Sequence, residues 1–138
     1  MNLFFFFLPV RSLSGVALEQ ITPSTVRKVF QEPDEIETNE NNNFGEGSLT
    51  YFFNSLQLTL FFNVQNLLCI AVANPSFKLF DEAIFNLREE ELISLFEKNG
   101  FPDHELDKDW GEKQLVFEKA GVTFFFDNQK VSEIFIDV

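Results

Sequence analysis

The chain has few of the residues that most often carry chemistry. Its 138 residues include one cysteine and one histidine. Cys69 cannot form a disulfide within the chain, and its place in the apolar run from Leu67 to Val72 predicts a small buried side chain, not a nucleophile. The chain has no Gly-x-Ser-x-Gly motif that would supply a serine nucleophile for His104. Its six glycines do not have the spacing of a phosphate-binding loop. We therefore expect no enzyme, no catalytic residue and no cofactor.

Basic residues are also scarce. The chain has 10 Lys and Arg residues against 22 Asp and Glu residues, a net charge of −12. Nucleic acids and anionic membranes attract proteins through basic surface, so this balance argues against both as partners. The acidity favours a basic protein partner, although an acidic surface that keeps a Phe-rich domain in solution has the same composition. The composition does not indicate an oligomeric state.

No apolar run is long enough to span a bilayer, which takes about 20 residues in a helix. The run from Leu3 to Leu8 lacks a basic segment before it and a cleavage site after it, and Pro9 and Arg11 interrupt it. These features argue against a signal peptide. We expect this segment to form a strand and the chain to be cytoplasmic.

Phenylalanine is abundant: the chain has 20, with one tryptophan and one tyrosine. Because the Phe ring has no polar group, most of these side chains are expected in the core, each contributing about 1.5–3 kcal/mol on burial. An exposed Phe patch that meets a partner is the alternative.

One motif occurs twice in the sequence. Val26 aligns with Leu92 and Leu49 with Leu115 at one constant offset (92 − 26 = 66), and the alignment continues through a helix and two strands before it slips by two at the following turn. A tandem repeat consists of two copies of one small unit that share a core. We expect a single domain, residues 1–138, made of two repeats at about 4–66 and 70–138.

The same helix and strand signals recur in both copies. Thr22 and Pro23 predict the N-cap and first turn of a short helix that Pro33 stops, and Asn86 with Glu89 predicts the start of a second helix that ends near Gly100. Short Phe-rich and β-branched runs follow each helix: 49–53, 56–62 and up to 73, then 114–117, 122–126 and 131–138. Short turns, such as Asn54-Ser55, make them antiparallel. The predicted fold is α+β, with two helix-plus-meander repeats related by a pseudo-two-fold, forming one curved antiparallel sheet on which the helices pack.

Alternation along the strands predicts two different sheet faces. Leu56, Leu58, Leu60 and Phe62 recur with the period of a strand and mark the buried face. Phe52, Phe61 and Phe125 fall on the opposite face, which two helices are not expected to cover. We therefore expect either a wrapped sheet or a sheet whose second face is partly an interaction surface.

Two acidic polar segments are the other candidate surface. The segment 34–47, which has the composition of a mobile loop, and its counterpart 102–112 each follow a helix and precede a hairpin, so repeat symmetry predicts that they lie near one another. The predicted partner-binding residues are Glu35, Glu37, Glu40, Asp103, Glu105, Asp107, Asp109 and Trp110. No metal is predicted, because Lys108 stands where a calcium-binding loop needs glycine for its sharp turn.

The segment from Thr22 to Pro33 resembles the repeat unit of the β-lactamase inhibitor proteins and the SmpA/OmlA-type outer-membrane lipoproteins. The inhibitor proteins are tandem repeats of small helices on an antiparallel sheet, which matches the two-copy layout. More loosely, the small acidic chain is similar to toxin-immunity proteins. The resemblance implies an inhibitor or immunity-type protein that acts by binding another protein. Together with the charge balance, it predicts a non-enzymatic protein-binding module that binds a basic protein partner through an acidic surface. The alternative function is a carrier of a small molecule or lipid in a Phe-lined cavity.

Overall fold

The structure is a computed structural model that describes residues 12–13, 16–17, 20–29, 31–39, 48–63, 66–108 and 113–138. The predicted strand near the start of the chain, Leu3 to Leu8, lies outside these residues. The described part confirms an α+β fold: two helices, one of them short, and one open antiparallel sheet of eight strands.

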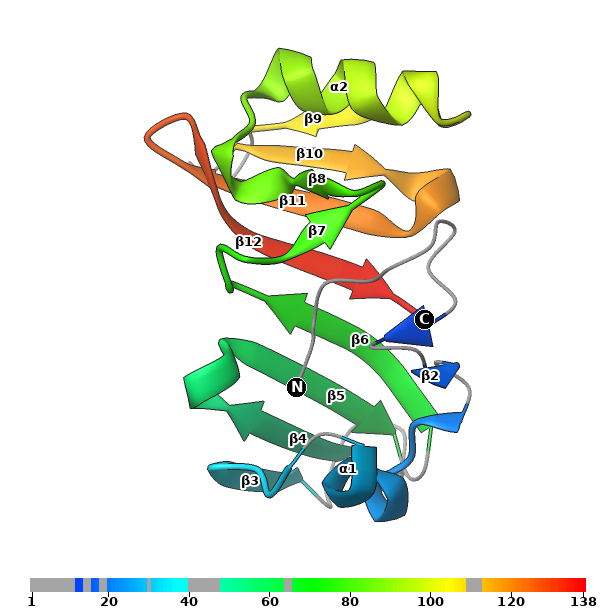
Figure 1. Cartoon of the computed structure of the whole chain (residues 1–138), viewed down its shortest axis with the longest axis vertical. Helices are drawn as coiled ribbons and strands as arrows, with labels where there is room; N and C mark the ends of the chain where they lie inside the picture. The colour runs from blue at the N-terminus through cyan, green and yellow to red at the C-terminus, as the bar shows by residue number, and fades with distance from the viewer. Residues whose placement is uncertain are drawn as a thin grey trace.

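The large sheet has the strand order β3-β4-β5-β6-β12-β11-β10-β9, and every neighbouring pair is antiparallel (Figure 1). Its strands are β3 (Glu35–Asn39), β4 (Ser48–Phe53), β5 (Leu58–Asn63), β6 (Asn66–Val72), β9 (Glu105–Asp107), β10 (Gln114–Phe117), β11 (Val122–Asp127) and β12 (Lys130–Asp137). Two small hairpins pair β1 (Ser12–Leu13) with β2 (Val16–Ala17) and β7 (Lys78–Leu79) with β8 (Glu82–Ala83). The 3-10 turns η2 (Asn54–Leu56), η3 (Ile84–Asn86) and η4 (Glu118–Ala120) lie between these elements.

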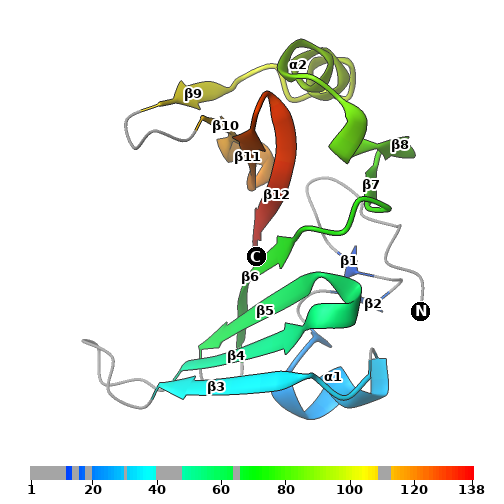
Figure 2. The same ribbon diagram turned by 90° about the vertical axis from the view of Figure 1, so that its left-hand side faces the viewer.

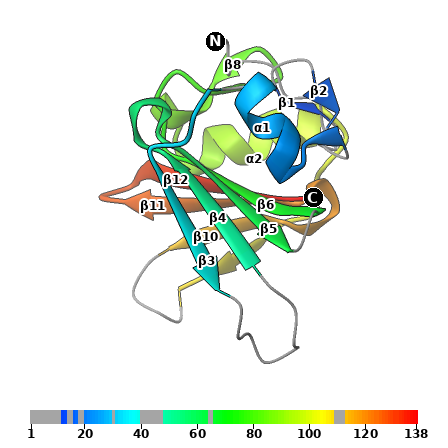
Figure 3. The ribbon, with the colours of Figure 1, turned by 90° about the horizontal axis from the view of Figure 1, so that it is seen from below.

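Both helices lie on the same side of the large sheet (Figures 2 and 3). They are α1 (Pro23–Val29) and α2 (Glu89–Lys98), close to the two predicted ranges. Val26 of α1 and Leu92 of α2 are completely buried, as the alignment of the two copies predicted. Neither described helix is long and apolar enough to cross a membrane.

The start of α1 confirms the prediction, whereas the start of α2 differs from it. The Thr22 carbonyl accepts the Val26 N–H at 3.1 Å, which makes Thr22 the N-cap. In α2 the N-cap is Arg88, whose backbone N–H donates to the Glu91 carboxylate at 3.1 Å. The predicted Asn86 cap is wrong because Asn86 ends η3, a turn whose hydrogen bond runs from the Leu87 N–H to the Ile84 carbonyl.

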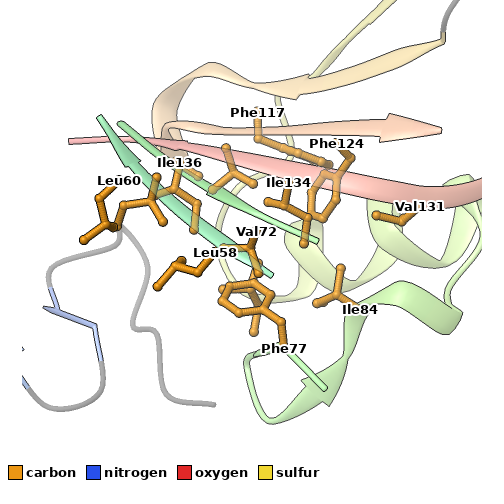
Figure 4. Packing of buried hydrophobic residues seen from close by; sticks show 14 of the residues in the cluster. Leu58, Leu60, Val72, Phe77, Ile84, Phe117, Phe124, Val131, Ile134 and Ile136 are labelled. Carbon is orange, nitrogen blue, oxygen red and sulfur yellow. The ribbon is translucent and has the colours of Figure 1, made fainter. Parts of the chain in front are cut away.

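The core lies between the helices and the sheet and is rich in stacked rings. Phe96 of α2 is fully buried; its ring stacks on Phe117 at a centroid distance of 4.0 Å and meets Phe124 edge-on at 5.6 Å. Figure 4 shows Phe117 and Phe124 beside Ile134. Phe77 and Ile84, from the segment between β6 and α2, belong to the same cluster. The described core is therefore filled mainly by aromatic and branched aliphatic side chains, as the composition predicted.

Each half of the sheet contains four consecutive strands, and the halves meet where β6 pairs with β12. Phe53 lies opposite Leu58 in the first half as Phe117 lies opposite Val122 in the second (117 − 53 = 64), and each half has a bulge at the same place, Phe61/Phe62 and Phe125/Phe126. Strands β4 to β6 therefore correspond to β10 to β12 at an offset of 64, and the predicted offset of 66 through the two strands is wrong. The edge strands β3 and β9 correspond at an offset of 70 (105 − 35), so the offset changes once before and once after the edge strand.

The turns between β4 and β5 and between β10 and β11 share one conformation. Each is a 3-10 turn followed by a residue with left-handed backbone: Gln57 at φ 51° and Gly121 at φ 70°. A left-handed conformation costs a non-glycine residue about 1–2 kcal/mol. Because Leu56 is the last residue of this turn and Gln57 follows it, the next strand begins at Leu58 and not at Leu56 as predicted.

Candidate functional site

The face of the large sheet that points away from the helices, here called the open face, is crossed by one continuous row of paired residues. Residues directly opposite each other on neighbouring strands share a face. The register joins, from one edge of the sheet to the other, Glu35, Phe52, Thr59, Ala71, Phe135, Thr123, Val116 and Glu105. The row therefore begins and ends with a glutamate and is apolar or hydroxyl-bearing in between.

Two further phenylalanines, Phe61 and Phe125, join Phe135 of the row and make the middle of the open face aromatic. Phe135 of β12 meets Phe125 of β11 edge-on at 4.9 Å and Phe61 of β5 at 6.5 Å. All three rings, and that of Phe52, are half-buried. Phe52, Phe61 and Phe125 are the rings that strand alternation predicted here, and their position is confirmed. Phe135 was missed, because the run from Val131 to Val138 was assigned as a strand without assigning its faces.

The two edge strands repeat an acidic-apolar-acidic triplet. Glu35-Ile36-Glu37 forms part of β3, and Glu105-Leu106-Asp107 forms β9. In each triplet the acidic residues pair with open-face residues, whereas Ile36 and Leu106 pair with the buried-face residues Tyr51 and Leu115. The predicted loops 34–47 and 102–112 therefore each contain an edge strand. Charge at a sheet edge also discourages pairing with other chains, so these carboxylates protect the edges whatever else they do.

The predicted partner-binding residues are not brought together at one end of the fold. Glu35 and Glu37 lie at one edge of the sheet, and Asp103, Glu105 and Asp107 lie at or next to the other. Seven strand spacings separate these edges, which is roughly 30 Å, and Figure 1 shows β3 and β9 at opposite ends of the molecule. The reason is that the halves join through their last strands, so the first strand of each half is the most distant. Glu40, Asp109 and Trp110 lie outside the described residues.

A cleft of about 240 Å³ adjoins the end of the row at β9. It is lined by Asp103, His104, Glu105, Val116, Glu118 and Lys119. The Lys119 ammonium donates to the Asp103 carboxylate at 2.6 Å, and this contact lowers the pKa of Asp103 and raises that of Lys119. Both partners are exposed, so the pair adds little to stability.

The cleft has acceptors for a cation. The Nδ1 atom of His104 lies 3.0 Å from the Pro102 carbonyl oxygen, and no Ser, Thr or Cys lines the cleft. Within the described ranges, no group of three or more His, Cys, Asp or Glu side chains could hold a metal ion. Glu105 and Glu118 offer carboxylates to a basic side chain entering from solvent.

Cys69 was predicted to be buried, but it lies half-buried on the open face, opposite Phe61 and Asp137 on the neighbouring strands. Burial, together with the negative charge of Asp137, raises the pKa of the thiol from 9.0 to about 11. Both causes disfavour the thiolate, which is the reactive form. The thiol is therefore a poor nucleophile at neutral pH.

We predict that iodoacetamide at pH 8 alkylates Cys69 about a hundredfold more slowly in the folded protein than in urea, because a pKa higher by two lowers the thiolate fraction by that factor. The rate in the folded protein should keep rising up to about pH 11, which mass spectrometry of the quenched protein would measure. A slow rate whose pH midpoint stays near 9 would assign the protection to restricted access and contradict the raised pKa.

Comparisons with known proteins give matches to structures only. No family model matches the chain, and no curated protein matches it. A crystal structure of YjgB, a DUF4309 family protein from Bacillus subtilis, is 11% identical, covers 91% of this chain and 84% of its own, and has a TM-score of 0.47. An extracellular protein containing an SCP domain from Bacillus anthracis is 14% identical, with a TM-score of 0.45; the match covers 84% of this chain and 43% of that one.

The predicted resemblance to β-lactamase inhibitor proteins, SmpA/OmlA-type lipoproteins and toxin-immunity proteins is wrong. The matched structures are the DUF4309 family protein and the SCP-domain protein. The helix segment from Thr22 to Pro33, on which the resemblance was based, is a short capped helix before a polar segment, a pattern that many α+β proteins share.

Proposed function

We propose that this protein is a binding module, not an enzyme, and that the open face of its sheet binds a basic protein. The observation that carries the proposal is the row from Glu35 to Glu105, with aromatic rings in the middle and carboxylates at both edges. Aromatic side chains dominate the buried centre of protein interfaces, and charged groups at the rim steer the partner. The net charge of −12 agrees with this rim.

The geometry of the open face defines the partner that would fit it. Such a partner has apolar side chains that contact Phe61, Phe125 and Phe135, with Lys or Arg on both sides, roughly 30 Å apart, to meet β3 and β9. A second copy of this chain is a poor fit, because its edges carry the same negative charge. The acidic segments and the second sheet face, two separate candidates in the sequence, are parts of one surface in this proposal.

We also infer that the curved sheet is a tandem duplication with a pseudo-two-fold between β6 and β12. The support is that each half has a small hairpin, a helix and four strands in the same order, with matching turns and bulges. Glu35, Ile36 and Glu37 correspond to Glu105, Leu106 and Asp107 at an offset of 70, because they pair with equivalent residues of β4 and β10. The duplication thus accounts for the acidic residues at both edges of the binding surface.

The alternative function, a carrier with a Phe-lined cavity, has less support. The rings of Phe96, Phe117 and Phe124 lie within contact distance of one another and fill space that such a ligand would need. The β9 cleft, in turn, is lined mainly by charged side chains. We therefore favour the binding module.

Selection from a displayed library of random 20-residue peptides tests the proposal. We expect the enriched peptides to carry Lys or Arg on both sides of apolar residues, and to lose at least tenfold in affinity for the variant Phe61→Ala/Phe125→Ala/Phe135→Ala. The matched control, Phe85→Ala, removes a half-buried ring on the helix side and should bind as the native protein does. Circular dichroism checks that each variant is folded. Enriched peptides without net positive charge, or equal affinity for the open-face variant, would refute the assignment.

A further inference from the structure

A second cleft, of about 500 Å³, lies between the segment leading into α2 and the turn that joins β11 to β12. It is lined on one side by Phe85, Asn86 and Arg88, and on the other by Asn128, Gln129 and Lys130. Figure 1 shows the β11–β12 turn beside the start of α2. None of these residues is in the row that crosses the open face, and none is one of its aromatic residues, so the cleft is separate from the surface proposed above.

Two basic residues, Arg88 and Lys130, line this cleft from opposite walls. The ion pairs among the described residues use Arg27, Lys113 and Lys119, and neither Arg88 nor Lys130 is in one. Lys28, Lys78, Lys98 and Lys108 are in none of these ion pairs either, so what distinguishes Arg88 and Lys130 is that they line one cleft. Of the neighbouring carboxylates, Glu89 pairs with Lys113, whereas Glu91 accepts the Arg88 N–H and lies beside Arg88.

The backbone under both cations is held in place. The Arg88 N–H is bonded to Glu91, and Lys130 is paired with Asp127 in the strand ladder. Between these two strand residues, Asn128 and Gln129 adopt left-handed backbone at φ 51° and 68°. This is the geometry of a tight hairpin turn, which fixes the direction from which both amide side chains approach the cleft.

The equivalent positions in the first half carry no positive charge. At the helix offset of 66, Arg88 corresponds to Thr22, whose backbone carbonyl caps α1. At the strand offset of 64, Lys130 corresponds to Asn66. The core and the acidic edges are alike in the two halves, whereas both cations of the cleft are present only in the second.

We propose that this cleft binds a small molecule through an oxyanion, a carboxylate or phosphate group. The Arg88 guanidinium and the Lys130 ammonium supply the charge, and a planar guanidinium can donate two parallel hydrogen bonds to either kind of oxyanion. The side-chain amides of Asn86, Asn128 and Gln129 add neutral donors, and Phe85 offers an apolar contact to the rest of the ligand. Asp127 is paired with Lys130 in the strand ladder and shares its face, so its carboxylate favours a ligand that also makes the neutral contacts of the cleft over a free anion.

Titration with two probes, inorganic phosphate and citrate, tests the proposal at constant ionic strength, with chloride as the balancing anion. We expect at least one probe to bind with a Kd below about 10 mM and to shift the backbone amide NMR signals of residues 86–88 and 128–130. Binding of phosphate alone assigns the site to phosphate groups, and binding of citrate alone assigns it to carboxylates.

The variant Arg88→Gln/Lys130→Gln should bind that probe at least tenfold more weakly. It leaves the backbone cap of α2 intact, because Glu91 accepts from the Arg88 main chain. The control Lys28→Gln/Lys78→Gln removes the same charge from exposed lysines of α1 and β7 and should bind as the native protein does. Absence of binding by both probes, signal shifts elsewhere, or an equal loss in the control would overturn the proposal.

Discussion

Replacement of Phe96 by alanine is expected to lower the free energy of unfolding by about 3–5 kcal/mol, the range for truncating a large buried aromatic residue. The Phe96 side chain is fully buried in α2. Its ring meets four others, stacked on Phe117 and edge-on to Phe80, Phe101 and Phe124. Because these rings come from strands, a loop and a helix, the cavity left by alanine cannot close by the movement of one element.

Two further variants separate the cavity from helix effects. Phe96→Leu keeps most of the volume and is expected to cost about half as much, whereas Ser94→Ala, at an exposed position of the same helix, should change stability by less than about 0.5 kcal/mol. Urea unfolding followed by circular dichroism measures all three. A loss below 1 kcal/mol for Phe96→Ala would show that this cluster is not the centre of the core.

Local rules were enough to predict most of the elements. Thr22 with Pro23 marked the start of α1, and alternation at Leu58, Leu60 and Phe62 identified the buried face, because both signals act over a few residues. The Arg88 cap was missed because arginine has no short side chain that bonds the first turn. Its backbone N–H, with Glu91 three residues later, provides the contact instead.

The edge strands could not be recognised by the same rules. Glu35-Ile36-Glu37 and Glu105-Leu106-Asp107 each have one apolar residue between two acidic ones, and such segments have low intrinsic strand propensity. They form strands because β4 and β10 present unpaired backbone groups to them. Whether a segment can pair with the edge of a sheet depends on the tertiary structure, and a short segment of sequence does not contain that information.

The error in the repeat offset has the same kind of cause. Side chains on a strand alternate with a period of two, so a shift from 66 to 64 leaves every apolar residue on its own face. Leu58 can be aligned with Phe124 or with Val122 without any conflict in burial, since all three are buried. Only the pairing of Phe53 with Leu58 and of Phe117 with Val122 decides between them. The distance between the two acidic segments also depends on the strand pairing, so it could not be predicted from the sequence either.

Neutralising the acidic edges with Glu35→Gln/Glu37→Gln/Glu105→Gln is expected to slow association with the selected basic peptides at least tenfold at low salt. All three glutamates are exposed: Glu35 and Glu105 end the row across the open face, and Glu37 lies beside Glu35 on the same face of β3. Charges at the rim of an interface act mainly on the association rate, through long-range attraction that salt screens over about 10 Å. The salt dependence of the rate should therefore become flatter, while the dissociation rate, set by the aromatic centre, changes little.

Surface plasmon resonance at several salt concentrations measures both rates. The matched control, Glu82→Gln/Glu90→Gln/Glu97→Gln, makes the same change in net charge at exposed positions of β8 and α2 and should slow association much less. If the two triple variants behave alike, the attraction comes from the overall charge and not from the edges. If the edge variant binds peptides as the native protein does but self-associates, edge protection is a sufficient role for these glutamates, because a neutral, unpaired β3 or β9 can add strands from another chain.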